Sequence, residues 1–581
     1  MFRTNPQSQQ PALFSDVNAL AEKRRQRLAA SWAGTFREQL FARFKEEPFA
    51  VLYSDIPSRP NVPVNVLMSL DVLKAGHGWS DEELYDHFLY DLQVRYALGY
   101  AGLSDGDFEL RTLYNFRQRL SQYNLEHGVN LLAPAFADIT DQQLTAFAVQ
   151  TGRQRMDSTQ IASNILVMSR LQLLVEAIHR LHRLLSEADQ QHYAELLALY
   201  VGETAGHYVY RVKGWSANSE QLQPVAQTLY ALLQGMAAAY GQAPAYQVAQ
   251  RLFDEQCRVV ATDVQPKANQ EISASSLQSL DDLEATYREK NRVGYKGYVA
   301  NVTETCDPEN PLQLITDVRV AANTTEDDAL LVAALPELKP RTDLDTLYTD
   351  GGYGGPQSDP ILGEQQVILI QTAIKGRKPD ASKLHLADFT IAQDAAGGPL
   401  AITCPEGQTV PVTPGAKPQR FAADFASATC ETCPLYAAGR CPPQPDNRRR
   451  SLRLTFNQAE VEKSQRHRRS RAEHHPGSNL RAAVESTVRS LKHPFPASKL
   501  PVRGLFRVTC LIVASAAMTN VRRIQRYRLK TRPAAPERQQ NRQAGQRSRG
   551  FALAAHCSGA CGAVLHLVFP PWAAYRLRFS C

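Results

Sequence analysis

Apolar residues in the first quarter of the chain recur at helical spacing. The run Val66–Leu73 begins an amphipathic pattern, and Ser80, followed by three acidic residues, is typical of a capped helix start. Arg111–Leu120 continues the pattern and carries three arginines. The spacing therefore predicts a helical domain over residues 15–150. Such helices form either a helix-turn-helix-like module that binds DNA or a bundle that mediates dimerisation.

Strand patterns appear after a second helical stretch. A leucine-rich helical periodicity runs from Ile165 to about Asp254. Runs rich in β-branched residues, bounded by Gly, Pro and Asn, then predict strands at residues 297–303, 312–320, 344–349 and 366–371. The stretch from about 376 to 445 is rich in Gly and Pro and is expected to be irregular. Helix is expected again from Ser478 to about Arg526. Together these elements predict an α/β fold with a mixed sheet flanked by helices.

These changes of pattern divide the chain into five parts. Residues 15–150 form the helical N-terminal domain. Residues 151–375 form the first part of a core, with a helical insert at about 165–256. A cysteine-rich insert follows at 376–446, and residues 447–527 form the C-terminal helical part of the core. Residues 528–581 are a basic tail that we expect to be disordered.

The charge of the chain is distributed unevenly. The net charge is only +7, but Arg448–Arg471 holds nine Lys or Arg against two Glu, and Arg522–Arg549 holds ten against one. Such blocks favour a polyanionic partner, because they neutralise phosphates, although each alone is also compatible with a solvated basic surface. The N-terminus is polar and resembles no secretory signal. The apolar run Cys510–Met518 is half a membrane span and suits a buried helix, so we expect an intracellular protein.

Three carboxylates stand out by their local setting. Asp157 lies in Arg-Met-Asp-Ser-Thr and Asp350 in Leu-Tyr-Thr-Asp-Gly-Gly-Tyr, and both resemble strand ends. Asp157 is also compatible with a helix cap, and Asp350 with a turn aspartate that bonds its own backbone. Glu485 lies on a predicted helix, in the pattern Arg-x3-Glu-x6-Lys. Acids from separate elements suit two divalent ions roughly 3.5–4 Å apart, which assist phosphodiester cleavage. Hard oxygen ligands select Mg²⁺ or Mn²⁺.

The helix around Glu485 has two neighbouring stripes. One stripe is apolar and consists of Leu480, Val484, Val488 and Leu491. The other places Glu485 among cations, namely Arg481, Arg489 and Lys492, which we expect to position DNA phosphates. Ser478 is expected to cap this helix. The alternative is an ordinary solvent-exposed Arg–Glu pair.

Four cysteines form a separate signal. Cys404 is followed after a gap by Cys430, Cys433 and Cys441. Four thiolates that include one Cys-x2-Cys pair suit tetrahedral, structural Zn²⁺. A chain that folds with free thiols and no metal is the alternative.

At these residues the chain resembles bacterial insertion-sequence transposases of the DDE class, whose catalytic core is ribonuclease-H-like. In one branch the third acid lies in Tyr-x2-Arg-x3-Glu-x6-Lys. Arg481, Glu485 and Lys492 match that pattern, and Ser478 stands where it has Tyr. The N-terminal stretch also resembles the helical domain that precedes such cores, for example in Gly78-Trp-Ser-Asp-Glu-Glu-Leu. The resemblance covers roughly residues 40–527.

The resemblance implies a DNA transposase in which Asp157, Asp350 and Glu485 bind two Mg²⁺ or Mn²⁺ ions. Its expected partners are double-stranded DNA, both the terminal inverted repeats of the element and the target, and a second copy of the chain. It implies no membrane and a nucleoid-associated location in a prokaryotic cytoplasm. A transposase-derived protein that binds DNA or regulates without cutting is the main alternative, and a stand-alone metal-dependent nuclease is another.

Overall fold

The protein is described here by a computed structural model. It describes residues 1–5, 15–56, 59–201, 208–211, 215–261, 263–372, 380, 382–394, 397–446, 450–472 and 480–532. Clustering of the chain separates Met1–Arg528 from Leu529–Cys581 as two compact units. Ser478 and almost all of the basic tail, residues 533–581, lie outside the described residues, so the expectations for them stay predictions.

The N-terminal region is helical, as the apolar spacing predicted. Its α-helices are α1 (Asp16–Ala19), α2 (Glu22–Ala29), α3 (Trp32–Gln39), α4 (Val64–His77), α5 (Asp81–Tyr90), α6 (Leu92–Ala97), α7 (Leu110–His127) and α8 (Leu132–Ala146). The Ser80 hydroxyl accepts from the Glu83 backbone N–H, and the Glu83 carboxylate accepts from the Ser80 N–H, so α5 begins with a complete capping box.

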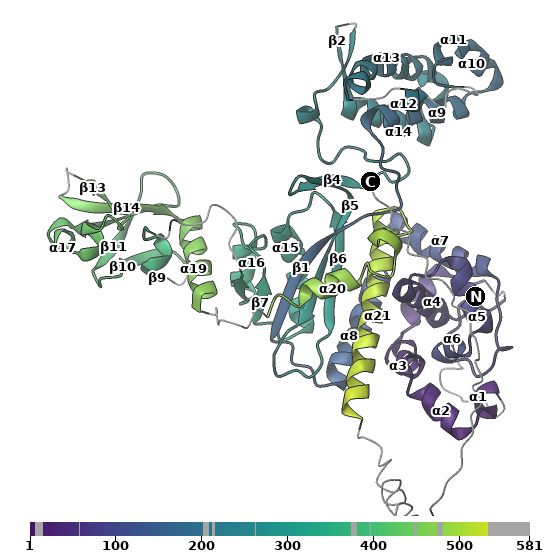
Figure 1. The fold of residues 1–581 in the computed structure, drawn as a ribbon, viewed down its shortest axis with the longest axis horizontal. Helices are drawn as coiled ribbons and strands as arrows, with labels where there is room; N and C mark the ends of the chain where they lie inside the picture. The colour runs from purple at the N-terminus through teal and green to yellow at the C-terminus, as the bar shows by residue number, and fades with distance from the viewer. Residues whose placement is uncertain are drawn as a thin grey trace, which may run out of the picture. The chain divides into compact units, whose positions relative to one another are not determined.

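A mixed sheet follows this helical region. Its strands are β1 (Arg153–Ile161), β4 (Thr286–Lys290), β5 (Val293–Thr305), β6 (Ile315–Ala322), β7 (Thr346–Thr349) and β8 (Ile368–Gln371). The long strand β5 pairs antiparallel with β1, β4 and β6, whereas β1 pairs parallel with β7, and β7 with β8 (Figure 1). The strands predicted at 297–303, 312–320, 344–349 and 366–371 correspond to β5, β6, β7 and β8.

Successive residues of β1 face opposite sides of this sheet, because side chains alternate along a strand. Met156 packs with α15 (Asp327–Leu338) and α16 (Ser358–Glu364) in one apolar cluster. Ile161 belongs to a second cluster, which also contains residues of the N-terminal helices and of the last long helix, α21 (Leu505–Thr531). Helices therefore cover both faces of the sheet, and the α/β class predicted from the sequence is confirmed.

The helical stretch between β1 and the rest of the sheet has an apolar core of its own. Its longer helices are α9 (Arg170–Leu184), α13 (Trp215–Tyr240) and α14 (Pro244–Gln256), and the hairpin β2 (Cys257–Val260) and β3 (Asp263–Pro266) follows them. Residues of α9 and α13, seven of them leucines, supply just over half of its buried side chains. These helices lie within the range where leucine periodicity predicted helix.

The expectation of irregular structure at residues 376–445 is wrong. This stretch contributes most of a second six-stranded sheet, with the strands β9 (Thr390–Gln393), β10 (Pro399–Thr403), β11 (Thr409–Pro414), β12 (Arg420–Ala426), β13 (Gln444–Asp446) and β14 (Ser451–Asn457). The boundary expected at residue 446 falls between β13 and β14, which pair in that sheet. The glycines and prolines occupy the ends and turns of short strands, which is why composition alone suggested irregular chain.

The single helical segment expected from Ser478 to Arg526 is also wrong. Helix α20 spans only Val484–Ser490, and the chain then makes turns before α21 begins at Leu505. Pro494 and Pro496 interrupt the pattern, because proline lacks a backbone N–H and disfavours helix in the preceding residue. The apolar stripe nevertheless packs into the interior, since Val484, Val488 and Leu491 are buried.

Helix α21 contains the apolar run Cys510–Met518. By length and composition α21 is the one described helix that qualifies as a membrane span, yet 67% of its apolar window is buried inside the structure. Ile512, Val513 and Ala516 pack in the same cluster as the N-terminal helices. The burial supports the interpretation of α21 as a core helix.

Candidate active site and cysteine cluster

Of the three predicted acids, Asp157 lies on β1 and Asp350 directly follows the adjacent parallel strand β7. The pairing joins Arg155 of β1 to Tyr348 of β7, and the same register extended by two residues places Asp350 opposite Asp157. Adjacent strands are about 4.8 Å apart, so these two residues are neighbours across the sheet. Asp157 lies in the middle of β1 and is neither a strand end nor a helix cap. Asp350 directly follows β7, as predicted, and accepts a hydrogen bond from the Gly352 N–H at 2.8 Å.

Arg481 joins the third acid to the first. Its Nη2 lies 3.2 Å from Oδ1 of Asp157, and its Nη1 lies 3.3 Å from Oε1 of Glu485. The Glu485 side chain is 63% exposed, whereas that of Asp157 is 10% exposed. The first and third acids are therefore bridged by one guanidinium, which stands between their carboxylates.

The electrostatics of Asp157 reflect this setting. Burial raises the pKa of its carboxyl group, and the nearby charge of Asp350 raises that pKa further, whereas Arg481 opposes both. For Arg481, burial lowers the pKa of the guanidinium, but the charges of Asp157, Asp350 and Glu485 outweigh burial and raise it. The guanidinium of Arg481 thus favours the charged form of the Asp157 carboxylate.

A fourth carboxylate, which the sequence reasoning missed, lies beside Asp350. Asp327 is the first residue of α15, and its Oδ1 accepts from the Ser158 hydroxyl at 2.7 Å. A Cβ added to Gly352 would lie 2.5 Å from Oδ2 of Asp327 and 3.1 Å from Oδ1 of Asp350. Only glycine fits this gap between two carboxylates. The acidic run Glu326-Asp327-Asp328 was visible in the sequence, but it is also an ordinary acidic helix start.

The other two predicted phosphate-positioning residues behave differently from each other. The Lys492 amine donates to Thr159 Oγ1 at 2.9 Å and to the Gln160 carbonyl at 3.1 Å, so it ties the chain after α20 to β1. Burial, and then the charge of Arg489, lowers the pKa of Lys492. Arg489 is exposed on α20. Contact with DNA phosphates stays a prediction for both.

A buried ion cluster holds α20 against the sheet. Glu304 of β5 is fully buried, and its Oε1 accepts from Arg155 Nε at 2.6 Å. Its Oε2 lies 2.7 Å from Arg523 Nη1 and accepts from the Thr487 hydroxyl of α20 at 2.8 Å. Arg155 also donates to the carbonyl of Leu480, just before α20. The segment that carries Arg481 and Glu485 is therefore held against β1 and β5 by these hydrogen bonds.

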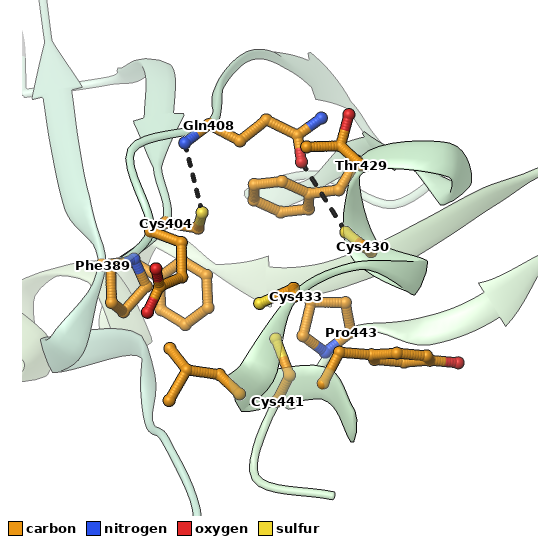
Figure 2. A pocket seen from close by; sticks show the side chains of 13 residues that line it. Phe389, Cys404, Gln408, Thr429, Cys430, Cys433, Cys441 and Pro443 are labelled. Atoms are coloured by element: carbon orange, nitrogen blue, oxygen red, sulfur yellow. Dashed lines mark hydrogen bonds between the residues drawn. The ribbon is translucent and has the colours of Figure 1, made fainter. Parts of the chain in front are cut away.

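The four predicted zinc ligands converge in the second sheet. Cys404 follows β10, Cys430 lies on α17 (Ser427–Glu431), Cys433 precedes α18 (Pro434–Ala437), and Cys441 lies before β13. All four line one small cavity of about 40 Å³ (Figure 2). Burial raises the pKa of Cys430, and that of Cys441 to about 11, and the neighbouring thiols add to both shifts. Such a cluster needs a cation to hold thiolates.

The donor chemistry of both places fits the expected metals. Oxygen donors surround the gap at Gly352, and sulfur donors line the cavity in Figure 2. Across the described residues, however, no three His, Cys, Asp or Glu side chains are arranged closely enough to hold an ion. At the acids the reason is Arg481, which occupies the space between Asp157 and Glu485.

Comparison with known families gives one match. Residues 403–525 match a family model described as a transposase DDE domain. No curated protein and no solved structure matches the chain. The matched segment contains Arg481, Glu485 and Lys492, together with all four clustered cysteines. The segment 403–525 is therefore similar to the DDE domain of transposases, in agreement with the resemblance that the sequence motif indicated.

Proposed function

We propose that the protein is a DNA transposase that cleaves the ends of its element and joins them to target DNA. The observation that carries the proposal is the bridge from Asp157 through Arg481 to Glu485, on a sheet where Asp350 neighbours Asp157. The mixed sheet, covered by helices on both faces, supports a ribonuclease-H-like core. Water attacks the phosphodiester at each element end, and the freed 3′ hydroxyl then attacks a phosphodiester of the target.

Asp157, Asp350 and Glu485 are the residues proposed to hold two Mg²⁺ or Mn²⁺ ions. When bound, such ions lower the pKa of the attacking hydroxyl and stabilise the leaving oxygen. Asp157 lies within β1 and Asp350 directly follows β7, whereas Glu485 lies on an exposed helix face, so the Glu485 side chain has the most room to adjust to an ion. Arg481 favours the charged form of Asp157 and is placed to donate both terminal nitrogens to a phosphate when DNA binds.

The cysteine cluster is proposed to hold one structural Zn²⁺ through Cys404, Cys430, Cys433 and Cys441. The four thiols come from elements around one end of the second sheet. A tetrahedral site that is filled by four protein sulfurs has no open position for substrate, so its role is to stabilise this sheet. Because the sheet precedes α20 in the chain, its stability also bears on the segment that carries Glu485.

The partners follow from the reaction. Double-stranded DNA supplies both the terminal inverted repeats and the target. Two element ends must meet during transposition, so a homodimer is the proposed active form. The proposed location is the prokaryotic cytoplasm, with the protein associated with the nucleoid.

The direct test of the proposal replaces the acid that follows β7. Asp350→Ala should abolish Mg²⁺-dependent cleavage of DNA that carries the element ends and leave affinity for that DNA largely intact. Glu364→Ala, an exposed acid on α16, is the matched control and should retain both properties. Cleavage by Asp350→Ala at the wild-type rate would overturn the role assigned to Asp350. A wild-type chain that binds the DNA with Mg²⁺ present but never cuts it would overturn the enzymatic function.

A further inference from the structure

A solvent-open groove of about 740 Å³ is lined by Glu485 and by other residues of α20. Its lining includes the small residues Ser486 and Ser490 of α20 and the basic residues Arg489, His493 and Arg522. Arg522 comes from α21, so the groove joins two elements that the sequence motif does not connect. Every titratable side chain that lines the groove, apart from Glu485, is basic.

The two arginines of this groove are not neutralised within the described part of the protein. Arg489 and Arg522 form no ion pair with any described acid, whereas their neighbours do. Arg481 pairs with Asp157 and Glu485, and Arg523, the residue after Arg522, pairs with the buried Glu304. A cation that is paired with a carboxylate binds a phosphate less strongly. Arg489 and Arg522 have no such partner among the described acids, so their charge is available to an external anion.

The groove is also held in shape. Arg522 donates from Nη2 to the carbonyl of Gly76 at 2.6 Å, near the end of α4. Gly78, which ends that helix, has φ +75°, and a Cβ there would lie 2.0 Å from the carbonyl oxygen of Pro494, another residue of the groove wall. The turn after α4 therefore packs directly against the turn after α20. A basic groove held by such close backbone contact is pre-organised for its ligand.

We propose that this groove binds the phosphodiester backbone of duplex DNA next to the bond at the acids, with Arg489 and Arg522 as phosphate ligands. His493 adds a ring N–H donor to the same backbone. The proposal rests on the proposed function, because it names the surface that would guide DNA to Glu485. It assigns a DNA contact to α21 and extends the contact surface beyond the Arg-x3-Glu-x6-Lys motif.

The test is the salt dependence of DNA binding by the full chain. Wild type, Arg522→Gln, Arg489→Gln and the double variant are titrated with one short duplex over a series of NaCl concentrations, without divalent metal. Each lost phosphate contact should reduce the slope of log K against log [NaCl] by about 0.9, and the double variant by about twice that. Arg522→Lys should retain most of the slope. Arg183→Gln, an exposed arginine on α9, is the control and should retain all of it.

The outcomes separate this inference from the proposed function. Slopes that are equal for wild type and the double variant, with both proteins folded, would overturn the groove even if wild type cleaves DNA. An equal loss in Arg183→Gln would also overturn it, because the effect would then reflect general charge. Reduced slopes in a protein that never cleaves DNA would support the groove while the catalytic proposal fails. Thermal unfolding of Arg489→Gln, whose side chain is exposed, guards against misfolding.

Discussion

The buried cluster at Glu304 allows a test in which the structure sets the magnitude. Glu304→Gln keeps the volume of the side chain but removes a negative charge that contacts both Arg155 and Arg523. The two arginine side chains are 10% and 18% exposed, so water cannot replace the lost partner. Both guanidinium groups are then left close together in a poorly solvated place.

Removing one partner of a buried ion pair costs about 3–5 kcal/mol. We therefore expect Glu304→Gln to lower the free energy of unfolding by about that amount, which corresponds to roughly two or more powers of ten in the unfolding equilibrium. Glu271→Gln is the matched control. Glu271 and its partner Arg258 are 43% and 48% exposed, so the loss of this pair should lower the free energy of unfolding far less.

Urea unfolding followed by tryptophan fluorescence measures both variants. Trp32 and Trp79 pack against the same apolar cluster as α21, so their emission reports on the unit that Arg523 stabilises. Below the unfolding transition, Glu304→Gln should also lower the rate of DNA cleavage more than it lowers DNA affinity. The reason is that the Thr487 hydroxyl of α20 loses the carboxylate oxygen that accepts its hydrogen bond. A loss of stability no larger than that of Glu271→Gln would refute the reasoning.

Three further predictions concern the N-terminal helices, the cysteines and the fourth acid. Burial, followed by the charge of a nearby arginine, lowers the pKa of His77 to about 4, so its contribution to stability is present above pH 6.5 and lost as pH falls toward 4. His77→Phe should remove that part of the pH dependence of the unfolding temperature, and an unchanged profile would contradict it. Cys430→Ser and Cys433→Ser should each abolish zinc binding, measured by atomic emission on the purified chain, whereas Cys510→Ser should retain it. If the purified wild-type protein contains no zinc, the alternative is correct and the four cysteines are free thiols. Asp327→Asn should weaken Mn²⁺ binding about tenfold, measured by calorimetry. An unchanged affinity would show that Asp327 only accepts the hydrogen bond from Ser158 of β1 and does not contribute to metal binding.

Local signals predicted several elements well. Ser80 caps α5, the run at Val66 lies in α4, and the strand at 297–303 lies in β5, because each pattern depends on neighbours in the chain. The stripe of Val484, Val488 and Leu491 is buried as its spacing indicated. The length of that helix was not predictable in the same way, since two prolines end it and the packing of α21 determines where helix resumes.

In the candidate site, too, some residues were recognisable from the local sequence and others only from the structure. Residue type and spacing singled out Glu485, Arg481 and the four cysteines as candidates without a fold, and their proposed roles stay predictions. The sequence reasoning did not identify Asp327, whose acidic neighbours resemble any helix start, nor the bonds of the Lys492 amine to β1.

The amino-acid sequence by itself determined the N-terminal helices, the strands β5 to β8 and the motif around Glu485, because each depends on residues close together in the chain. Only the tertiary structure decided that Asp350 lies beside Asp157, that Arg481 bridges Asp157 and Glu485, and that Arg522 joins a groove with Arg489. Strand pairing and helix packing bring together residues far apart in the chain. Their register depends on which distant apolar faces bury one another, and no local pattern contains that information.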